Sequence, residues 1–163
     1  MRTNNLLKAL LDTNVLIPAF LFRHINYEIV QLGNRKKYLS VTCREVIDEF
    51  RFHLLFDPHF KDYQISEEKV DAYINFILSF SELATVHENI SIRPPIPHSN
   101  DEPMVAKASC YKTNYLVTWN NHLLNLIRAD HVFFVKPLKF MKILQPLGHI
   151  IYQLSMKIKL IFS

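Results

Sequence analysis

The sequence contains only two glycines, Gly33 and Gly148, and this scarcity excludes two common nucleotide-binding motifs. A dinucleotide fingerprint needs three closely spaced glycines, and a phosphate-binding loop of the Walker type needs a glycine at each end. Neither motif can be written anywhere in the chain. A protein with this sequence that acts on nucleotides or nucleic acids must therefore use another kind of site.

Cysteine is equally scarce, because Cys43 and Cys110 are the only two in the chain. Two thiols so far apart in the sequence form neither a disulfide framework nor the ligand set of a structural zinc ion. This usage fits a reducing compartment, and we expect the protein to be cytoplasmic.

Long apolar runs are also missing. The apolar stretch near the N-terminus is interrupted by Asp12 before it reaches the length of a signal-peptide core or a membrane span, and residues 148–163 are too short and too charged for a span. We therefore expect no membrane association. With 49% hydrophobic and 21% charged residues, the chain suits one globular domain, which we place at residues 1–146, followed by an apolar and basic tail at 147–163.

Acidic residues are nearly absent from the second part of the chain. Residues 103–163 carry 8 Lys and Arg against 1 Asp and Glu, a net +7, whereas residues 1–102 carry 11 against 14, a net −3. A basic segment can face a polyanion such as RNA. Ordinary solvated lysines would give the same count, so charge alone leaves both interpretations open.

What the sequence does contain is an alternation of strand-like and helix-like segments. Strands are predicted at residues 8–11, 38–41, 85–92, 115–118 and 132–135, and helices at 15–32, 44–56, 66–78, 98–111, 123–127 and 138–144. Such alternation predicts an α/β domain with a mainly parallel sheet and right-handed crossovers.

Asp12 follows the first predicted strand directly. The carboxyl ends of strands are where open α/β sheets bind their ligands, so Asp12 is a candidate site residue. The alternative is that Asp12 serves only the turn or caps the next helix, for which Thr13 and Asn14 are also suitable.

Glu49 lies on the predicted helix 44–56 and is bracketed by apolar neighbours. At 100° per residue it falls about 60° from Val46 and about 20° from Phe56. A carboxylate at the rim of an apolar face needs a partner, since burying it unpaired costs several kcal/mol or forces protonation. An ion pair with Lys or Arg would be the structural explanation.

Asp101 stands at a helix entrance in which Pro103 is tolerated and acidic residues suit the helix dipole. It could be no more than a helix cap. The next predicted strand ends at Thr118 and is followed by Asn120, which repeats the strand-to-loop arrangement of Asp12. These side chains could converge on one pocket.

Five motifs then carry a resemblance to a known family. They are residues 11–16 (LDTNVL), 41–50 (VTCREVIDEF), 100–108 (NDEPMVAKA), 115–124 (YLVTWNNHLL) and 132–140 (VFFVKPLKF). In order and spacing they resemble the PIN-domain nucleases, and in particular the toxin-like branch related to the VapC toxins, over about residues 8–144.

The resemblance implies a three-layer α/β/α fold and an endoribonuclease that serves as the toxin of a toxin–antitoxin pair. It assigns Asp12, Glu49 and Asp101 as metal ligands, with Asn120 as a fourth catalytic residue that orients a ligand or water. All-oxygen ligands suit Mg²⁺ or Mn²⁺, and two carboxylates about 4 Å apart repel by roughly 4 kcal/mol unless a cation or a proton intervenes. An RNA substrate, an antitoxin protein and a homodimer are the implied partners.

The sequence departs from the family pattern at the fourth acidic position, which is often Asp and here is Asn120. The usual acids just before the third motif are replaced by His98 and Asn100. The competing hypothesis is therefore a degenerate PIN domain that binds RNA or a protein partner without cutting.

Overall fold

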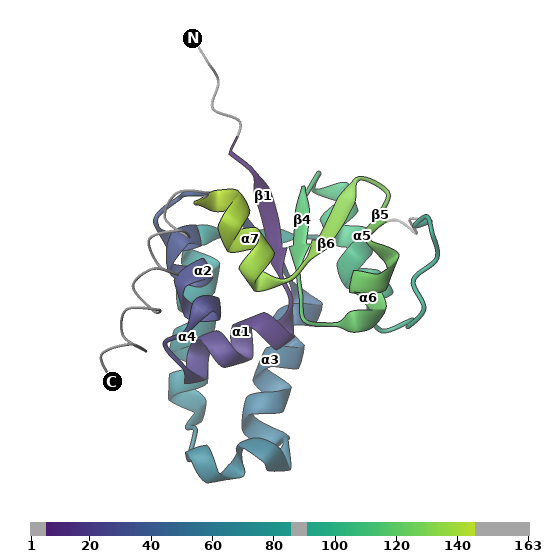
Figure 1. Cartoon of the computed structure of the whole chain (residues 1–163). Helices are drawn as coiled ribbons and strands as arrows, with labels where there is room; N and C mark the ends of the chain where they lie inside the picture. Colours follow the sequence, from purple (N-terminus) through teal and green to yellow (C-terminus); the bar gives the residue numbers. More distant parts are fainter. Residues whose placement is uncertain (1–5, 86–90, 146–163) are drawn as a thin grey trace, which may run out of the picture.

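The computed structural model describes residues 6–85 and 91–145 and contains a central sheet of six strands (Figure 1). The strands are β1 (Lys8–Leu11), β2 (Leu39–Cys43), β3 (Ser81–Ala84), β4 (Tyr115–Val117), β5 (Arg128–Ala129) and β6 (Val132–Val135), in the spatial order β3-β2-β1-β4-β6-β5. All neighbours pair in parallel except β5 and β6. The expectation of an α/β domain with a mainly parallel sheet is confirmed.

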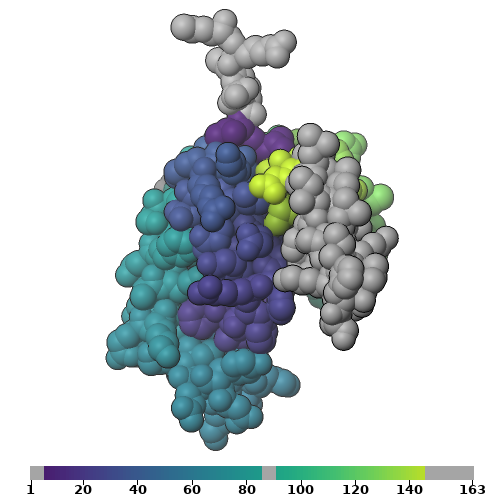
Figure 2. Space-filling view, turned by 60° about the vertical axis from the view of Figure 1, so that its left-hand side comes forward, coloured from purple at the N-terminus to yellow at the C-terminus, as the bar shows by residue number. Residues whose placement is uncertain are grey.

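Helices flank this sheet. They are α1 (Thr13–Leu21), α2 (Ile25–Asn34), α3 (Arg44–Phe56), α4 (Glu67–Phe80), α5 (Glu102–Cys110), α6 (Asn121–Leu126) and α7 (Pro137–Leu144), with the 3-10 helix η1 at Pro58–Tyr63. Helix α5 packs against β2 and β6, while α2 packs against α1 and α7. The end of α3, η1 and the start of α4 form a lobe that extends away from the sheet (Figures 1 and 2). None of the described helices is both long and apolar enough to cross a membrane.

The core forms where the central strands meet these helices. Ala9, Leu10 and Leu11 of β1 are at most 3% exposed, because β1 lies between two other parallel strands. On α7, the buried ring of Phe140 packs edge-on against Tyr38, with ring centroids 5.1 Å apart. Parallel strands that are covered on both faces become continuous apolar runs, which is why β1 could be recognised in the sequence.

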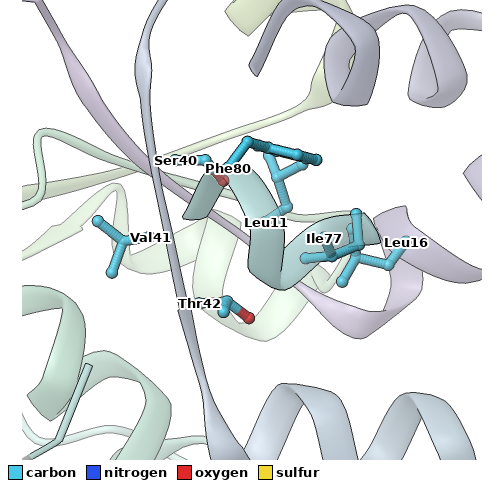
Figure 3. Close-up of a pocket in the computed structure, with 7 residues that line it drawn as sticks. All are labelled: Leu11, Leu16, Ser40, Val41, Thr42, Ile77 and Phe80. Atoms are coloured by element: carbon cyan, nitrogen blue, oxygen red, sulfur yellow. The ribbon is translucent and has the colours of Figure 1, made fainter. Parts of the chain in front are cut away.

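A small apolar pocket lies between β1, β2, α1 and α4 (Figure 3). It is lined by Leu11, Leu16, Ser40, Val41, Thr42, Ile77 and Phe80. The pocket has no space for a molecule the size of water, so it is a packing gap rather than a ligand site.

The single helix predicted at residues 15–32 is wrong, because the structure has two helices there. Phe22 and His24 between them have extended backbones, and the Phe22 ring contacts Tyr63 of η1. An unbroken helix of that length would run about 27 Å in one direction. The break instead lets α2 fold back on α1 and bury Ile29 and Val30.

The strand predicted at residues 85–92 is also misplaced. The strand is β3, which follows α4 without a connecting loop and pairs with β2 from Ser40↔Ser81 to Cys43↔Ala84. Residues 86–90 lie outside the described part of the chain, as does the whole of the tail predicted at 147–163. Helix α6 begins at Asn121 rather than at Leu123, and the two-residue β5 was not predicted at all.

Gly33 directly follows the helix predicted at residues 15–32, but in the structure it lies inside α2 and is buried. A Cβ atom at this position would lie 2.8 Å from Tyr38 Oη and 3.1 Å from Phe80 Cε2. Tyr38 cannot easily move away, because it is fully buried and its hydroxyl donates a hydrogen bond to Ile29 O at 3.1 Å. Gly33 is therefore needed for close packing between α2 and Tyr38.

Gly33→Ala should destabilise the protein even though alanine favours helix by about 1 kcal/mol. We expect a net loss of about 1–3 kcal/mol, since the new methyl group must displace a fixed ring. Urea denaturation measures this, with Asn34→Ala, at an exposed position of the same helix, as the matched control. A Gly33→Ala protein as stable as Asn34→Ala would contradict the packing role.

Candidate active site

The site forms where the direction of strand order reverses. From β1 the chain proceeds outward to β2 and β3, and then returns to place β4 on the other side of β1. In open α/β sheets, ligands bind in the crevice at the carboxyl ends of the two strands that flank such a switch point. Here those ends carry Asp12 after β1 and Thr118 after β4, aligned because Leu11 pairs with Val117.

Asp12 is held at this point by both backbone and side-chain hydrogen bonds. Its amide donates to Val117 O at 3.0 Å, and its Oδ2 accepts from Thr118 Oγ1 at 2.6 Å and from Asn14 Nδ2 at 2.8 Å. The residue occupies the N-cap position of α1 but makes no capping hydrogen bond with its side chain. The carboxylate is therefore turned toward Thr118, at the carboxyl end of β4, and is not merely a helix cap.

Burial, with smaller contributions from the carboxylates of Glu49 and Asp101, raises the pKa of Asp12 from 3.8 to about 6, although the hydrogen bonds from the Thr118 hydroxyl and the Thr13 backbone lower it. Asp12 is only 6% exposed, so its charge is poorly solvated. Glu49 and Asp101 are thus near enough for their charges to act on the Asp12 carboxylate. A proton or a cation at Asp12 would relieve the repulsion.

Asn14 connects β4 to this arrangement, and sequence reasoning missed its role. Its Nδ2 also donates to Thr118 Oγ1 at 3.1 Å, and its Oδ1 accepts the backbone N–H of Trp119 at 3.0 Å. In the sequence Asn14 looked like an ordinary capping residue. Only the pairing of β1 with β4 could have indicated that it ties the two loops together.

Glu49 reaches the site from α3. Its Oε2 accepts a hydrogen bond from Thr13 Oγ1 at 2.8 Å, and its Oε1 lies 3.5 Å from His53 Nε2. The Glu49 side chain is 54% exposed, and no Lys or Arg of the described chain forms an ion pair with it. The ion pair considered from the sequence is thus replaced by a link to Thr13, the neighbour of Asp12.

Asp101 and Asn120 meet on the other side of the crevice. Asn120 Nδ2 donates to Asp101 Oδ2 at 3.0 Å, while Asn120 Oδ1 accepts the backbone N–H of His122 at 2.9 Å and so caps α6. The Asp101 side chain makes no capping hydrogen bond to α5. The structure therefore brings these two predicted site residues into direct contact.

A further ion pair holds the helices that carry two of the acids. Lys107 Nζ of α5 lies 2.6 Å from Glu45 Oε2 of α3, and the lysine side chain is only 15% exposed. The pair fixes α3, with Glu49, next to α5, with Asp101 at its start. Lys107 therefore helps to position the two helices that carry Glu49 and Asp101.

Comparison with protein families decides the assignment, because the model of the PIN domain matches residues 8–122. The chain belongs to the PIN-domain family. The matched region contains Asp12, Glu49, Asp101 and Asn120. Members of this family are generally nucleases and typically use divalent metal ions.

The fold of this PIN domain is similar to that of a chain in the crystal structure of VapBC2 from Rickettsia felis bound to a DNA fragment from their promoter. The two chains are 15% identical, the match covers 80% of this chain and 98% of the other, and the TM-score is 0.53. At this identity the likeness shows the shared fold. Comparison with curated protein sequences gives no significant match.

The side chains of this PIN domain suit a hard divalent cation in their chemistry, because the candidate ligands are all carboxylate oxygens. Within residues 6–85 and 91–145, no three acidic, histidine or cysteine side chains lie close enough to share one ion. Mg²⁺ does not require such a cage, since it commonly binds through one or two carboxylates together with water and phosphate oxygens. Asp12 and Asp101 are the candidates for direct ligation.

The raised pKa of Asp12 makes the stability of the metal-free protein depend on pH. Between the ordinary pKa of 3.8 and about 6, the folded state binds more protons than the unfolded state, so stability falls as pH rises. From pH 4.5 to pH 7 the wild type should lose about 2 kcal/mol more than Asp12→Asn, which cannot ionise. Urea denaturation of both proteins in EDTA at the two pH values measures the difference, and parallel pH profiles would show that Asp12 is not desolvated.

Asn120→Asp should place a second carboxylate where an amide N–H now meets Asp101. Without metal we expect a loss of about 1–3 kcal/mol from repulsion, and with Mn²⁺ a recovery, since a ligand bound only by the folded state stabilises it. Asp can still cap α6, so the cap is retained. Calorimetric titration of Mn²⁺ should give a higher affinity in the mutant.

Asn121→Asp is the matched control, because it adds the same charge one residue further along at an exposed position of α6. If both variants have the wild-type Mn²⁺ affinity and melting temperature in EDTA, Asn120 does not belong to the acidic site.

Proposed function

We propose that this PIN domain is a divalent-metal-dependent endoribonuclease that hydrolyses RNA phosphodiester bonds. The observation that carries the proposal is the buried carboxylate of Asp12, whose pKa near 6 reflects its burial and the nearby charges of Glu49 and Asp101. A buried carboxylate that two nearby acids repel is costly to fold. Such an arrangement is typical of sites that bind a cation or move a proton.

Each residue has a separate part in the proposed site. Asp12 and Asp101 would hold Mg²⁺ or Mn²⁺ directly, and Glu49, held by Thr13 on the α3 side, would add its negative charge to the site. When bound, the metal activates a water molecule for in-line attack and neutralises charge on the phosphate. Thr118 and Asn14 keep Asp12 in place through its Oδ2, and Asn120 orients Asp101 through its amide N–H.

We further propose that the protein is the toxin of a toxin–antitoxin pair, that it forms a homodimer and that it acts in the cytoplasm. The resemblance of its five motifs to the VapC-like branch supports this setting. The fold shared with a chain of the VapBC2 structure agrees with it.

A second candidate function is RNA or protein binding without catalysis. The observation in its favour is Asn120, whose amide oxygen already caps α6 and whose uncharged side chain replaces an acid. Against it stand Asp12 and Asp101, neither of which makes a capping hydrogen bond that would explain its place in the fold. Binding of RNA that stays intact under every metal condition would favour this function.

Asp101→Asn should reduce RNA cleavage about a hundredfold or more while the fold is retained, because it removes a negatively charged ligand from the metal. Cleavage should also stop in EDTA and return with Mg²⁺ or Mn²⁺. Glu102→Gln, at the exposed neighbouring position, is the matched control and should cleave like the wild type. Full activity of Asp101→Asn, or of the wild type in EDTA, would contradict the proposed mechanism.

A further inference from the structure

Trp119, the only tryptophan in the chain, lies between two residues that contact the acids of the candidate active site. It stands between Thr118, whose hydroxyl donates to Asp12, and Asn120, whose amide donates to Asp101. Its side chain is 40% exposed, although a large aromatic residue beside a buried core would ordinarily be covered. The core of the domain does not explain why a tryptophan is placed here.

The indole is held at its edge and not by its face. Its Nε1–H donates to Asn26 Oδ1 at 3.3 Å, and Asn26 is itself only 7% exposed on α2. The backbone N–H of Trp119 donates to Asn14 Oδ1 at 3.0 Å. Because the indole N–H lies in the plane of the ring, neither hydrogen bond occupies the π-face.

No aromatic ring and no Arg or Lys side chain of the described residues packs on the indole, whereas other aromatic residues of the domain contact one another in pairs. A ring that is fixed at its edge, partly exposed and without a stacking partner is suited to receive a flat ligand. Next to carboxylates that attract a metal ion and a phosphate, the flat ligand that fits is a nucleobase.

We propose that Trp119 is a stacking platform for one base of a single-stranded RNA, and that it fixes the nucleotide next to the phosphate to be cut. This proposal rests on the proposed nuclease function and adds a residue that positions the substrate. Bases in a duplex are already stacked on each other and cannot reach an aromatic face, so the RNA must be single-stranded at this point. Every base has a π-face, so recognition by Trp119 tolerates different sequences.

The single tryptophan also provides a direct measurement. Its fluorescence can be excited selectively over that of the seven tyrosines, and a base that stacks on the indole should quench it. Single-stranded RNA is titrated with Ca²⁺ in place of Mg²⁺, and the RNA is checked on a gel to be intact. We expect saturable quenching by the single strand and little quenching by the same sequence as a duplex.

The stacked base is located with a series of RNA strands, each lacking the base at one successive position while keeping every phosphate. Affinity should fall at one position of the series and stay near the original value at the others. A role of Trp119 in folding alone cannot produce this pattern, because the protein is unchanged throughout. An even response along the series would overturn the proposal.

Variants give the second arm, measured by the anisotropy of labelled RNA. Trp119→Ala should weaken binding about 5- to 150-fold, whereas Trp119→Phe, which loses the bond to Asn26 but keeps a ring, should stay within a few-fold of wild type. Phe56→Ala is the control, since Phe56 is 68% exposed at the far end of α3. If Trp119→Ala does not fold, the base-deletion series on the wild type tests whether Trp119 stacks on a base.

The outcomes separate this proposal from the nuclease itself. The stacking platform alone is overturned if Trp119→Ala binds RNA like the wild type and RNA does not quench the wild-type fluorescence. In that case the wild type still cleaves RNA with metal, and Asp101→Asn does not. Absence of both RNA binding and cleavage in the wild type overturns the nuclease function and the stacking platform together. Preference for duplex over single strand also overturns the stacking platform.

Discussion

The parallel pairing of β1 with β4 is the constraint on which the site depends. It places Asp12 beside Thr118 at the carboxyl end of the sheet and leaves the Asp12 side chain only 6% exposed. An ionised carboxylate in such surroundings loses most of its hydration, and two hydrogen bonds to Oδ2 compensate only in part. Ionised Asp12 therefore lowers the stability of the folded domain, and a cation bound beside it would offset this cost.

The remaining elements bring charge and support to this point. Helix α3 carries Glu49, the start of α5 carries Asp101, and the Lys107–Glu45 pair holds the two helices together. The loop after β4 supplies Thr118, Trp119 and Asn120 in succession, so one short segment contacts Asp12 and Asp101 and presents an aromatic face.

Much of this arrangement could be predicted because it depends on local patterns. The apolar strand before Asp12 and the helical spacing around Glu49 are visible in the sequence, and both residues lie where those patterns place them. The role of Asn14 could not be predicted, because its side-chain amide donates a hydrogen bond to Thr118, which lies 104 residues away in the sequence.

Other features were hidden for local reasons. The four residues of β3, Ser81–Ala84, contain no β-branched or aromatic side chain, whereas the segment that follows does, so the strand was placed too late. The break between α1 and α2 has no glycine to mark it, and Pro18 lies inside α1. Tertiary contacts of Phe22 and the packing of α2 on α1 determine it.

Asp12 and Asp101 are the proposed ligands of a divalent ion, and Mn²⁺ can be located directly by its anomalous scattering. Crystals of the wild type and of Asp101→Asn would be grown with the same Mn²⁺ concentration. We expect an anomalous peak within coordination distance of both carboxylates in the wild type, and the loss of this peak in the mutant. An ordered wild-type site without such a peak, at Mn²⁺ concentrations that support full cleavage, would contradict it.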